Sequence, residues 1–305
     1  MNRFEYREAQ TVQEAIDMMH EAGGQIIAGS TDVLMRWRQG LCKPRYVLNI
    51  KRIPGLDEVD YETQRGLRLG ALVSIRTLEQ HPLIRTHYPA LAQAAATFAG
   101  VQVRNLATLG GNVCNASPAG DTLPALLAYD ATCRVVGPAG ERLVPLAAFF
   151  RGPGQTVLQP AELLLELRLP APLPRTGALY IKHSPRHTMD IAAVGIASVV
   201  ALGEQDAICR DVRITLSAVA PMVVRAKSAE AMLQGRVINA AQIQQAAQAA
   251  VADASPIDDI RATAGHRRAV IAPLVQRTLH YAVQMAQGTP LSFQTQRGLA
   301  VEAVF

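Results

Sequence analysis

Two short segments rich in glycine and small polar residues hold the groups best suited to binding a diphosphate. The first segment comprises Ile26, Ile27, Ala28, Gly29, Ser30, Thr31, Asp32 and Val33. Its apolar start predicts a strand that turns sharply at Gly29 into a helix, which would expose consecutive backbone N–H groups. Ser30 and Thr31 add hydroxyl donors. Taken alone, this segment is better explained as an ordinary strand–helix turn with a hydroxyl cap, so it does not identify a site by itself.

The second segment comprises Thr108, Leu109, Gly110, Gly111 and Asn112, and a polar stretch continues from it to Asp121. Paired glycines let a backbone approach a ligand where any Cβ would collide. Thr108 and Asn112 can donate to phosphate or sugar-alcohol oxygens, and Asp121 can accept from hydroxyl groups or a ring N–H. A long surface loop with a Gly-Gly turn is the alternative. Together, the two segments predict a dinucleotide held between two loops.

Several other kinds of site are absent from the sequence. Neither G-x-G-x-x-G nor G-x-x-x-x-G-K-[ST] occurs, which excludes the common Rossmann and P-loop signatures. H-E-x-x-H and G-x-S-x-G are also missing, so we assign no catalytic residue. The cysteines Cys42, Cys114, Cys133 and Cys209 form no C-x-x-C pair and no zinc-ligand spacing with histidines. We therefore expect free thiols in a reducing compartment and no metal site in this chain.

The pattern of apolar residues and turn residues predicts how the chain positions the two segments. Thr11 and Glu14 form a T-x-x-E capping box that starts a helix, and Gly23 and Gly24 end it. Further strands are predicted at residues 25–28, 46–50, 67–72 and 163–169, and residues 132–136 and 141–144 are predicted to form a hairpin around the turn 137–140. Helices are predicted at residues 33–38 and 89–99, and Ser74 is expected to cap another that reaches past Leu78. The first segment then lies at a strand–helix turn, and the second lies in a long loop, residues 108–121.

A proline-rich linker, residues 170–174, separates this region from a different pattern. Strands are predicted at residues 178–182, 191–202 and 212–219, and helices follow at residues 229–233, 240–253 and 267–287, with Asn239 as an N-cap. Strands first and helices afterwards predict an α+β layer with helices on one face of an antiparallel sheet.

Charge and hydropathy narrow the possible partners. The net charge of +5 is spread over 305 residues without a basic run beside aromatic residues, which argues against nucleic-acid binding. The polar N-terminus lacks the apolar core of a signal peptide, and no apolar run is long enough to span a bilayer. We therefore expect a cytoplasmic protein without a membrane span.

The order and spacing of several motifs resemble those of one known family. Residues 28–32 read AGSTD, residues 107–112 read ATLGGN, and residues 116–118 read ASP, with Asp121 just beyond. Residues 182–186 read KHSPR, residues 190–192 read DIA, and residues 259–261 read DIR, followed by the pair at 267–268. In these motifs the chain resembles the medium, FAD-binding subunit of the xanthine dehydrogenase and carbon monoxide dehydrogenase family of molybdenum hydroxylases.

The resemblance implies a two-part FAD-binding domain of the vanillyl-oxidase (PCMH) type over residues 1–172. It also implies a small α+β C-terminal domain of the CO dehydrogenase flavoprotein type over residues 175–288, followed by a tail, residues 289–305. FAD would be bound non-covalently, since the first segment contains no histidine. One branch of the family has an inserted four-cysteine loop near the second segment; this chain lacks such a set, so we expect no iron–sulfur cluster in it.

The same resemblance implies cofactor contacts from all residues of 26–33 and 108–112, and from four further positions. Phe98 would lie close to the flavin, Asp121 would contact FAD, and Leu164 and Lys182 would contact the flavin from strands around the linker. A cation at Lys182 would stabilise negative charge on reduced flavin. By residue type alone, Phe98 and Leu164 are core residues and Lys182 is a solvated lysine at a strand end.

The implied function is electron transfer within a larger complex. A large partner subunit would hold molybdopterin, a small partner would hold two [2Fe–2S] clusters, and FAD in this chain would pass electrons to an external acceptor. The assembly would be a dimer of heterotrimers. Two alternatives are a self-sufficient FAD oxidoreductase of the same fold, for which no acid or base is evident, and a scaffold that has lost flavin, against which both glycine segments argue.

Overall fold

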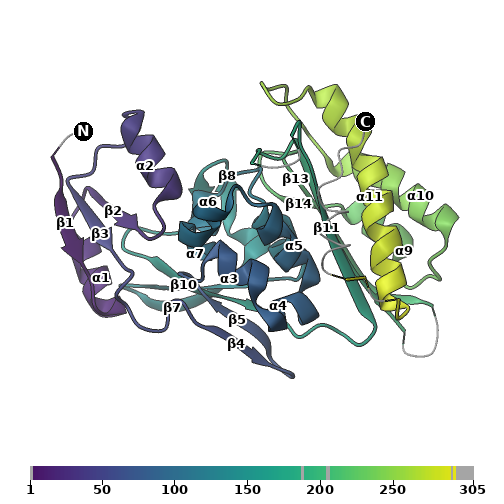
Figure 1. Cartoon of the computed structure of the whole chain (residues 1–305), viewed down its shortest axis with the longest axis horizontal. Coiled ribbons are helices and arrows are strands. Elements are labelled where there is room, and N and C mark those ends of the chain that lie inside the picture. Colours follow the sequence, from purple (N-terminus) through teal and green to yellow (C-terminus); the bar gives the residue numbers. More distant parts are fainter. Residues whose placement is uncertain (1–2, 187–188, 204–206, 290, 293–305) are drawn as a thin grey trace.

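The computed structural model describes residues 3–186, 189–203, 207–289 and 291–292 (Figure 1). The predicted tail, residues 289–305, lies almost entirely outside the described residues. Along the long axis of the molecule, a small N-terminal strand–helix unit comes first, then a sheet covered by helices, then a second sheet with helices on its outer face (Figure 1). The arrangement is therefore a mixed α+β fold, as the sequence predicts.

The N-terminal unit is a parallel three-stranded sheet with strand order β1-β3-β2. It contains β1 (Glu5–Glu8), α1 (Val12–Met19), β2 (Gly24–Ile27), α2 (Thr31–Arg38) and β3 (Tyr46–Asn49). Thr11 caps α1 as predicted by accepting from the N–H of Glu14, but the Glu14 carboxylate accepts from Gln10 rather than from Thr11. Helix α1 already ends at Met19, before the glycine pair that we expected to end it.

The central unit is an antiparallel five-stranded sheet with order β4-β5-β10-β6-β7. Its strands are β4 (Val59–Glu62), β5 (Gly66–Gly70), β10 (Leu163–Leu169), β6 (Thr132–Gly137) and β7 (Gly140–Pro145). The helices are α3 (Ile75–Gln80), α4 (Pro82–His87), α5 (Pro89–Thr97), α6 (Val101–Leu106), α7 (Leu109–Asn115) and α8 (Thr122–Ala128), which lie on one side of it (Figure 1). Three short elements, η1 (Leu146–Ala148), β8 (Phe150–Gly152) and β9 (Gln155–Thr156), precede β10.

A ladder of alternating charges crosses this sheet, with one residue from each strand. Arg68 on β5 lies 3.7 Å from Asp60 on β4 and 3.7 Å from Glu166 on β10. Arg134 on β6 lies 3.7 Å from Glu166 and 2.6 Å from Glu141 on β7. The ladder surrounds the buried Glu166 carboxylate with cations, which compensates for its desolvation.

The C-terminal unit is an antiparallel sheet with order β11-β12-β13-β14. Its strands are β11 (Thr176–His183), β12 (Val194–Leu202), β13 (Cys209–Ser217) and β14 (Val224–Arg225). The helices that follow are α9 (Lys227–Leu233), α10 (Ala240–Ala249), η2 (Ala250–Asp253) and α11 (Ala264–Ala286). The predicted Asn239 cap is present as a complete capping box with Gln242. Within the described ranges, no helix combines the length and hydropathy needed to cross a bilayer.

The C-terminal sheet is covered on both faces, and every residue of β12 is buried. Leu179, Ile196 and other residues of one face pack against α9, α10 and α11 in one hydrophobic cluster. Tyr180, Ala197 and other residues of the opposite face belong to the largest cluster, which also contains the core of the central unit. One continuous core therefore joins the regions on either side of the proline-rich linker.

One predicted element is wrong in kind, because residues 108–121 are not one long loop. Thr108 caps a helix, α7, and both glycines of the pair lie in its first turn. Leu109 and Val113, four residues apart, bury their side chains on one face of α7, and this burial offsets the low helix propensity of glycine. Strands β1 and β4 were not predicted, because both are short, polar edge strands without a continuous apolar face.

Candidate functional site

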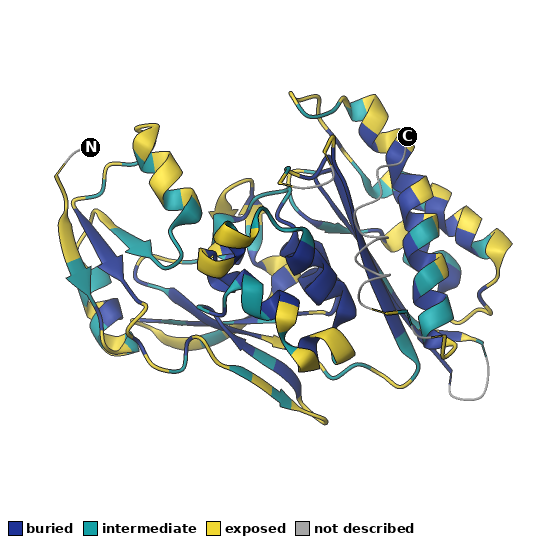
Figure 2. Cartoon of the chain, viewed as in Figure 1, coloured by how far each residue is buried: buried dark blue, intermediate teal, exposed yellow. Residues whose placement is uncertain are grey.

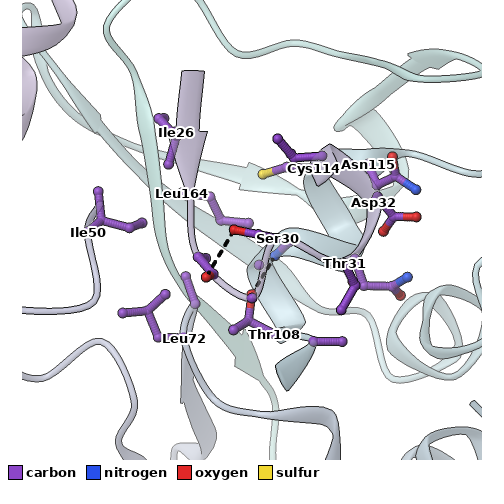
Figure 3. Close-up of a pocket in the computed structure, with 18 of the residues that line it drawn as sticks. Ile26, Ser30, Thr31, Asp32, Ile50, Leu72, Thr108, Cys114, Asn115 and Leu164 are labelled. Carbon is purple, nitrogen blue, oxygen red and sulfur yellow. Dashed lines mark hydrogen bonds between the residues drawn. The ribbon is translucent and has the colours of Figure 1, made fainter. Parts of the chain in front are cut away.

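A cavity of about 240 Å³ opens where the N-terminal unit meets the central unit (Figure 3). Both predicted segments line it, from opposite sides. The lining residues are Gln25, Ile26, Ala28, Gly29, Ser30, Thr31, Asp32, Val33, Arg36, Ile50, Ala71, Leu72, Phe98, Ala107, Thr108, Gly110, Gly111, Asn112, Cys114, Asn115, Leu158, Glu162, Leu163 and Leu164. The fold thus brings together two segments that are about 80 residues apart in the sequence.

The first segment presents backbone donors that are not covered by a side chain. Ser30, the N-cap of α2, adopts a left-handed conformation with φ 60° and ψ 11°, and α2 has no side-chain cap among the described residues. The Ser30 hydroxyl instead points towards the carbonyl of Ala28 at 3.4 Å (Figure 3). The first-turn N–H groups of a helix have no intrahelical acceptor, and those of α2 have no other acceptor among the described residues, so they are available to a ligand.

Gly29 brings the first segment close to the backbone that precedes the second. A Cβ at Gly29 would lie only 2.0 Å from the carbonyl oxygen of Leu106. Glycine is therefore required here for packing between the two units, and the cavity depends on that close approach.

The second segment uses its first-turn donors within the protein. The N–H groups of Leu109 and Gly110 donate to the carbonyls of Val73 and Ala71, at 2.9 and 2.8 Å. The Gly111 N–H donates to the Thr108 hydroxyl oxygen at 3.2 Å, as Figure 3 shows. The Asn112 N–H donates to the Thr108 carbonyl. This segment can offer a ligand the Thr108 hydroxyl proton and the Asn112 side-chain amide, but not a row of free N–H groups.

The two glycines of the second segment have different surroundings. A Cβ at Gly110 would lie 2.7 Å from the Cβ of Ala71, so this glycine allows α7 to pack against the end of β5. A Cβ at Gly111 would meet only the Thr108 hydroxyl, at 2.9 Å, and Gly111 is exposed to the cavity. The space beside Gly111 is therefore available to a ligand.

Charged residues at the cavity were not predicted apart from Asp32. Arg36 lies one helical turn after Asp32 and faces the same cavity, a spacing that the sequence alone could have indicated. Burial raises the pKa of Asp32, and the Arg36 charge opposes that rise. Glu162 forms an ion pair with Arg142 at 2.7 Å, and the hydrogen bond from Arg142 lowers the pKa of Glu162.

Cys114 also lines the cavity, and its role there was not predicted. Burial raises the pKa of its thiol to about 12, so the thiol is neutral near pH 7. Phe98 and Leu164, two predicted ligand contacts, line the cavity and also pack against the largest hydrophobic cluster. Their packing role and a role in binding are thus compatible.

Asp121 and Lys182, two other predicted contacts, do not line the cavity. They form a buried ion pair in which Lys182 Nζ lies 2.9 Å from Asp121 Oδ2. The ammonium also donates to the Thr97 carbonyl at 3.2 Å, and the Tyr180 hydroxyl donates to Asp121. Burial raises the pKa of Asp121, and Lys182 opposes that rise. Lys182 is therefore neither a solvated lysine nor free to meet a ligand, because its charge is already paired.

Ile27 and Leu109 are likewise absent from the cavity lining. Ile27 is the last residue of β2, where alternate side chains point to opposite faces of the sheet. Leu109 is fully buried in the largest cluster. The cavity therefore contains thirteen of the seventeen predicted contacts, and Ile27, Leu109, Asp121 and Lys182 are the four outside it.

Comparison with known families and proteins gives consistent matches over almost the whole chain. Residues 2–172 match the family described as the FAD binding domain in molybdopterin dehydrogenase. Residues 179–282 match the CO dehydrogenase flavoprotein C-terminal domain.

Individual relatives match over similar lengths. The carbon monoxide dehydrogenase medium chain of Hydrogenophaga pseudoflava is 32% identical over 92% of this chain and 97% of its own length. A putative xanthine dehydrogenase FAD-binding subunit of Escherichia coli K12 is 29% identical, covering 93% and 97%. Among solved structures, a carbon monoxide dehydrogenase from H. pseudoflava matches with a TM-score of 0.88 and 32% identity, covering 92% of this chain and 97% of that one.

Proposed function

The chain belongs to the family of medium, FAD-binding subunits of the xanthine and carbon monoxide dehydrogenases, and from this membership we propose how its cavity serves that role. As a member, the chain is an oxidoreductase flavoprotein subunit. We propose that FAD lies non-covalently in the cavity, with its diphosphate between residues 26–33 and residues 108–112. Bound there, FAD would supply the redox chemistry of the chain.

One observation supports this placement above the others. The uncapped start of α2 faces the same cavity as the exposed Gly111, so unused N–H donors lie opposite a space where a side chain is missing. A diphosphate needs both features, because its oxygens accept several hydrogen bonds and its bulk excludes a Cβ. The residues present therefore fit the cofactor that the family binds.

Different residues of the cavity would contact different parts of the cofactor. The N–H groups at the start of α2, with the Ser30 and Thr31 hydroxyls, would donate to the diphosphate oxygens. Arg36, which faces the same cavity, would offset part of the diphosphate charge. Thr108 and Asn112 would donate from the opposite wall. Phe98 and Leu164 would shield the apolar parts of the cofactor from water.

The buried Asp121–Lys182 pair would not contact the cofactor directly. It would instead position residues that do. The Lys182 ammonium donates a hydrogen bond to the Thr97 carbonyl. The next residue in the chain is Phe98, which lines the cavity. The pair would thus fix the end of α5 and the orientation of Phe98.

We further propose that this chain receives electrons from [2Fe–2S] clusters in a small partner subunit and passes them to an external acceptor. A large partner subunit would hold molybdopterin and oxidise the substrate, and two such heterotrimers would associate. The proposed boundaries of the two domains are residues 1–172 and 175–288.

The test is to purify the native complex, identify its chains, and record its metals and visible spectrum. We expect three kinds of chain, molybdenum, iron, and one FAD for each copy of this chain. A complex that lacks flavin would contradict the cofactor assignment. Substrate turnover by the isolated chain would instead favour a self-sufficient oxidoreductase.

A further inference from the structure

Helix α2 contacts the rest of the protein unusually little. It has eight residues, all described, and none of them is buried (Figure 2). A surface helix normally buries an apolar stripe against its own domain. Val33 and Trp37 of this helix are half-buried, whereas Leu34 and Met35 are exposed, so part of the apolar surface of α2 is left uncovered by the described residues.

The residues of α2 fall on two functional sides. Asp32, Val33 and Arg36 line the cofactor cavity. Leu34 and Met35 lie outside the cavity lining and are 45% and 53% exposed, and Leu41, just after the helix, is 67% exposed. We call Leu34, Met35 and Leu41 the α2 patch. Large apolar side chains that stay exposed on one helix and just after it are a feature of protein–protein contact sites.

A groove of about 200 Å³ adjoins the C-terminal half of α2, and Phe4, Trp37, Arg38, Gly40, Cys42, Lys43 and Pro44 line it. The Phe4 and Trp37 rings, 5.1 Å apart, form an apolar part of its surface. Arg38 and Lys43 form no ion pair with any described residue, so the groove is cationic. The Trp37 indole N–H is buried and has no acceptor among the described residues, so its hydrogen bond is left for a group outside them.

We infer that the α2 patch and this groove form the docking surface for a partner subunit that presents apolar side chains beside carboxylates. The inference rests on the proposed function in so far as it assumes that the chain works in a complex. Charge complementarity determines the chemistry of the partner, since the groove offers Arg38 and Lys43, which have no ion-pair partner in the described part of the chain, next to aromatic and aliphatic surface. The partner would bury the apolar side chains and place its carboxylates beside Arg38 and Lys43.

This surface is continuous with the cofactor site through a single helix. The start of α2 faces the cofactor, and its outer side and end would contact the partner.

The test uses the whole complex, co-expressed, with the double variant Leu34→Glu/Met35→Glu in this chain. The matched control is Leu143→Glu on β7, because Leu143 is 52% exposed and lies on the central sheet away from α2. Subunit composition is measured by native mass spectrometry, flavin content by absorbance, and folding by circular dichroism. We expect partner binding to weaken by at least about tenfold in the double variant, while the control assembles normally.

Each other outcome has a defined meaning. Unchanged assembly of the double variant overturns the inference, and so does equal loss in the Leu143→Glu control. Loss of self-association alone would identify a second copy of this chain as the occupant. Intact assembly, together with vesicle binding that the wild type shows and the double variant lacks, would identify a membrane as the occupant of this surface. The vesicles contain phosphatidylcholine and phosphatidylserine.

If the double variant does not fold, Leu34→Gln/Met35→Gln replaces it. Absence of flavin from the wild-type complex would contradict the proposed function, whereas the assembly result tests the docking surface.

Discussion

The cavity and the Asp121–Lys182 pair are two polar regions in which we expected cofactor contacts, and they use their polar groups in opposite ways. In the cavity, the start of α2 keeps its N–H donors uncovered and Gly111 leaves open space. At the pair, the Asp121 carboxylate accepts from Lys182 and Tyr180, and both charged side chains are buried. The first region is arranged for a ligand, and the second is complete within the chain.

The difference shows that a polar residue near a cofactor can serve binding or stability, and that the structure decides which. Residues whose hydrogen-bonding groups remain unused should affect cofactor affinity when changed. Residues that satisfy one another in the interior should affect the free energy of unfolding. Variants in both regions test this division.

Removing one member of the buried pair should have the largest effect on stability. Lys182→Met would leave the Asp121 carboxylate buried without its cation, and we expect a loss of about 3–5 kcal/mol in the free energy of unfolding. The double variant Asp121→Asn/Lys182→Met should recover most of that loss. Chemical denaturation of the flavin-free chain measures both values. An unchanged stability of Lys182→Met would show that the two regions do not differ as proposed.

Gly29→Ala should affect both stability and binding, because Gly29 provides the contact that forms the cavity. The added Cβ would collide with the Leu106 carbonyl, and we expect a loss of about 1–3 kcal/mol. The cavity would also change shape, so flavin content should fall. Thermal unfolding and flavin absorbance of the same preparation test the two effects. Wild-type values for both would mean that the close approach is not needed.

Gly111→Leu should remove flavin while leaving the fold intact. Its side chain would occupy the cavity beside Thr108 and displace the Thr108 hydroxyl that caps α7, which costs about 1 kcal/mol. Leucine is a better helix former than glycine by a similar amount, so the net change in stability should be less than about 1 kcal/mol. The matched control is Gly265→Leu, at another exposed first-turn glycine, in α11. Normal flavin content in Gly111→Leu would count against the placement of the diphosphate.

The smallest effect concerns His183, which is next to Lys182 in β11 but contacts His266 of α11, with their Nε2 atoms 3.0 Å apart. Burial and the nearby His266 lower the pKa of His183 below its usual 6.5. The unfolded chain therefore binds this proton more tightly, and the free energy of unfolding should decrease as pH falls below about 6.5. The slope differs from zero only between the pKa values of His183 in the folded and the unfolded chain, so the total loss is small.

Denaturation at several pH values, for the wild type and His183→Gln, measures that slope. The variant should lose less stability than the wild type between pH 7.5 and 5.5. Equal slopes for the two proteins would show that groups other than His183 cause the pH dependence of stability.

Much of the fold follows from local sequence signals. Thr11, Ser74 and Asn239 each precede a helix and cap it as expected. The hairpin around residues 137–140 and strand β10 lie where the pattern places them. These features depend on interactions between residues close in the sequence, so the amino-acid sequence alone predicts them.

The arrangement of the site depends on contacts that the sequence does not display. The Leu109 N–H donates to Val73, which is 36 residues earlier, and this contact decides that α7 cannot offer that donor to a ligand. Lys182 meets Asp121 across 61 residues. A motif states which groups are present, but only the packing of distant elements shows which of them remain unused.

The core shared by Tyr180 on β11, Ala197 on β12 and the helices of the central unit has a consequence for how the molecule unfolds. The two family regions meet at a proline-rich linker, yet neither region can keep its core without the other. A fragment ending at the linker would expose the apolar surface of α5 and α8, and its complement would expose one face of its sheet. The chain should therefore melt in a single cooperative transition, and the boundary between its family regions is not a boundary between folding units.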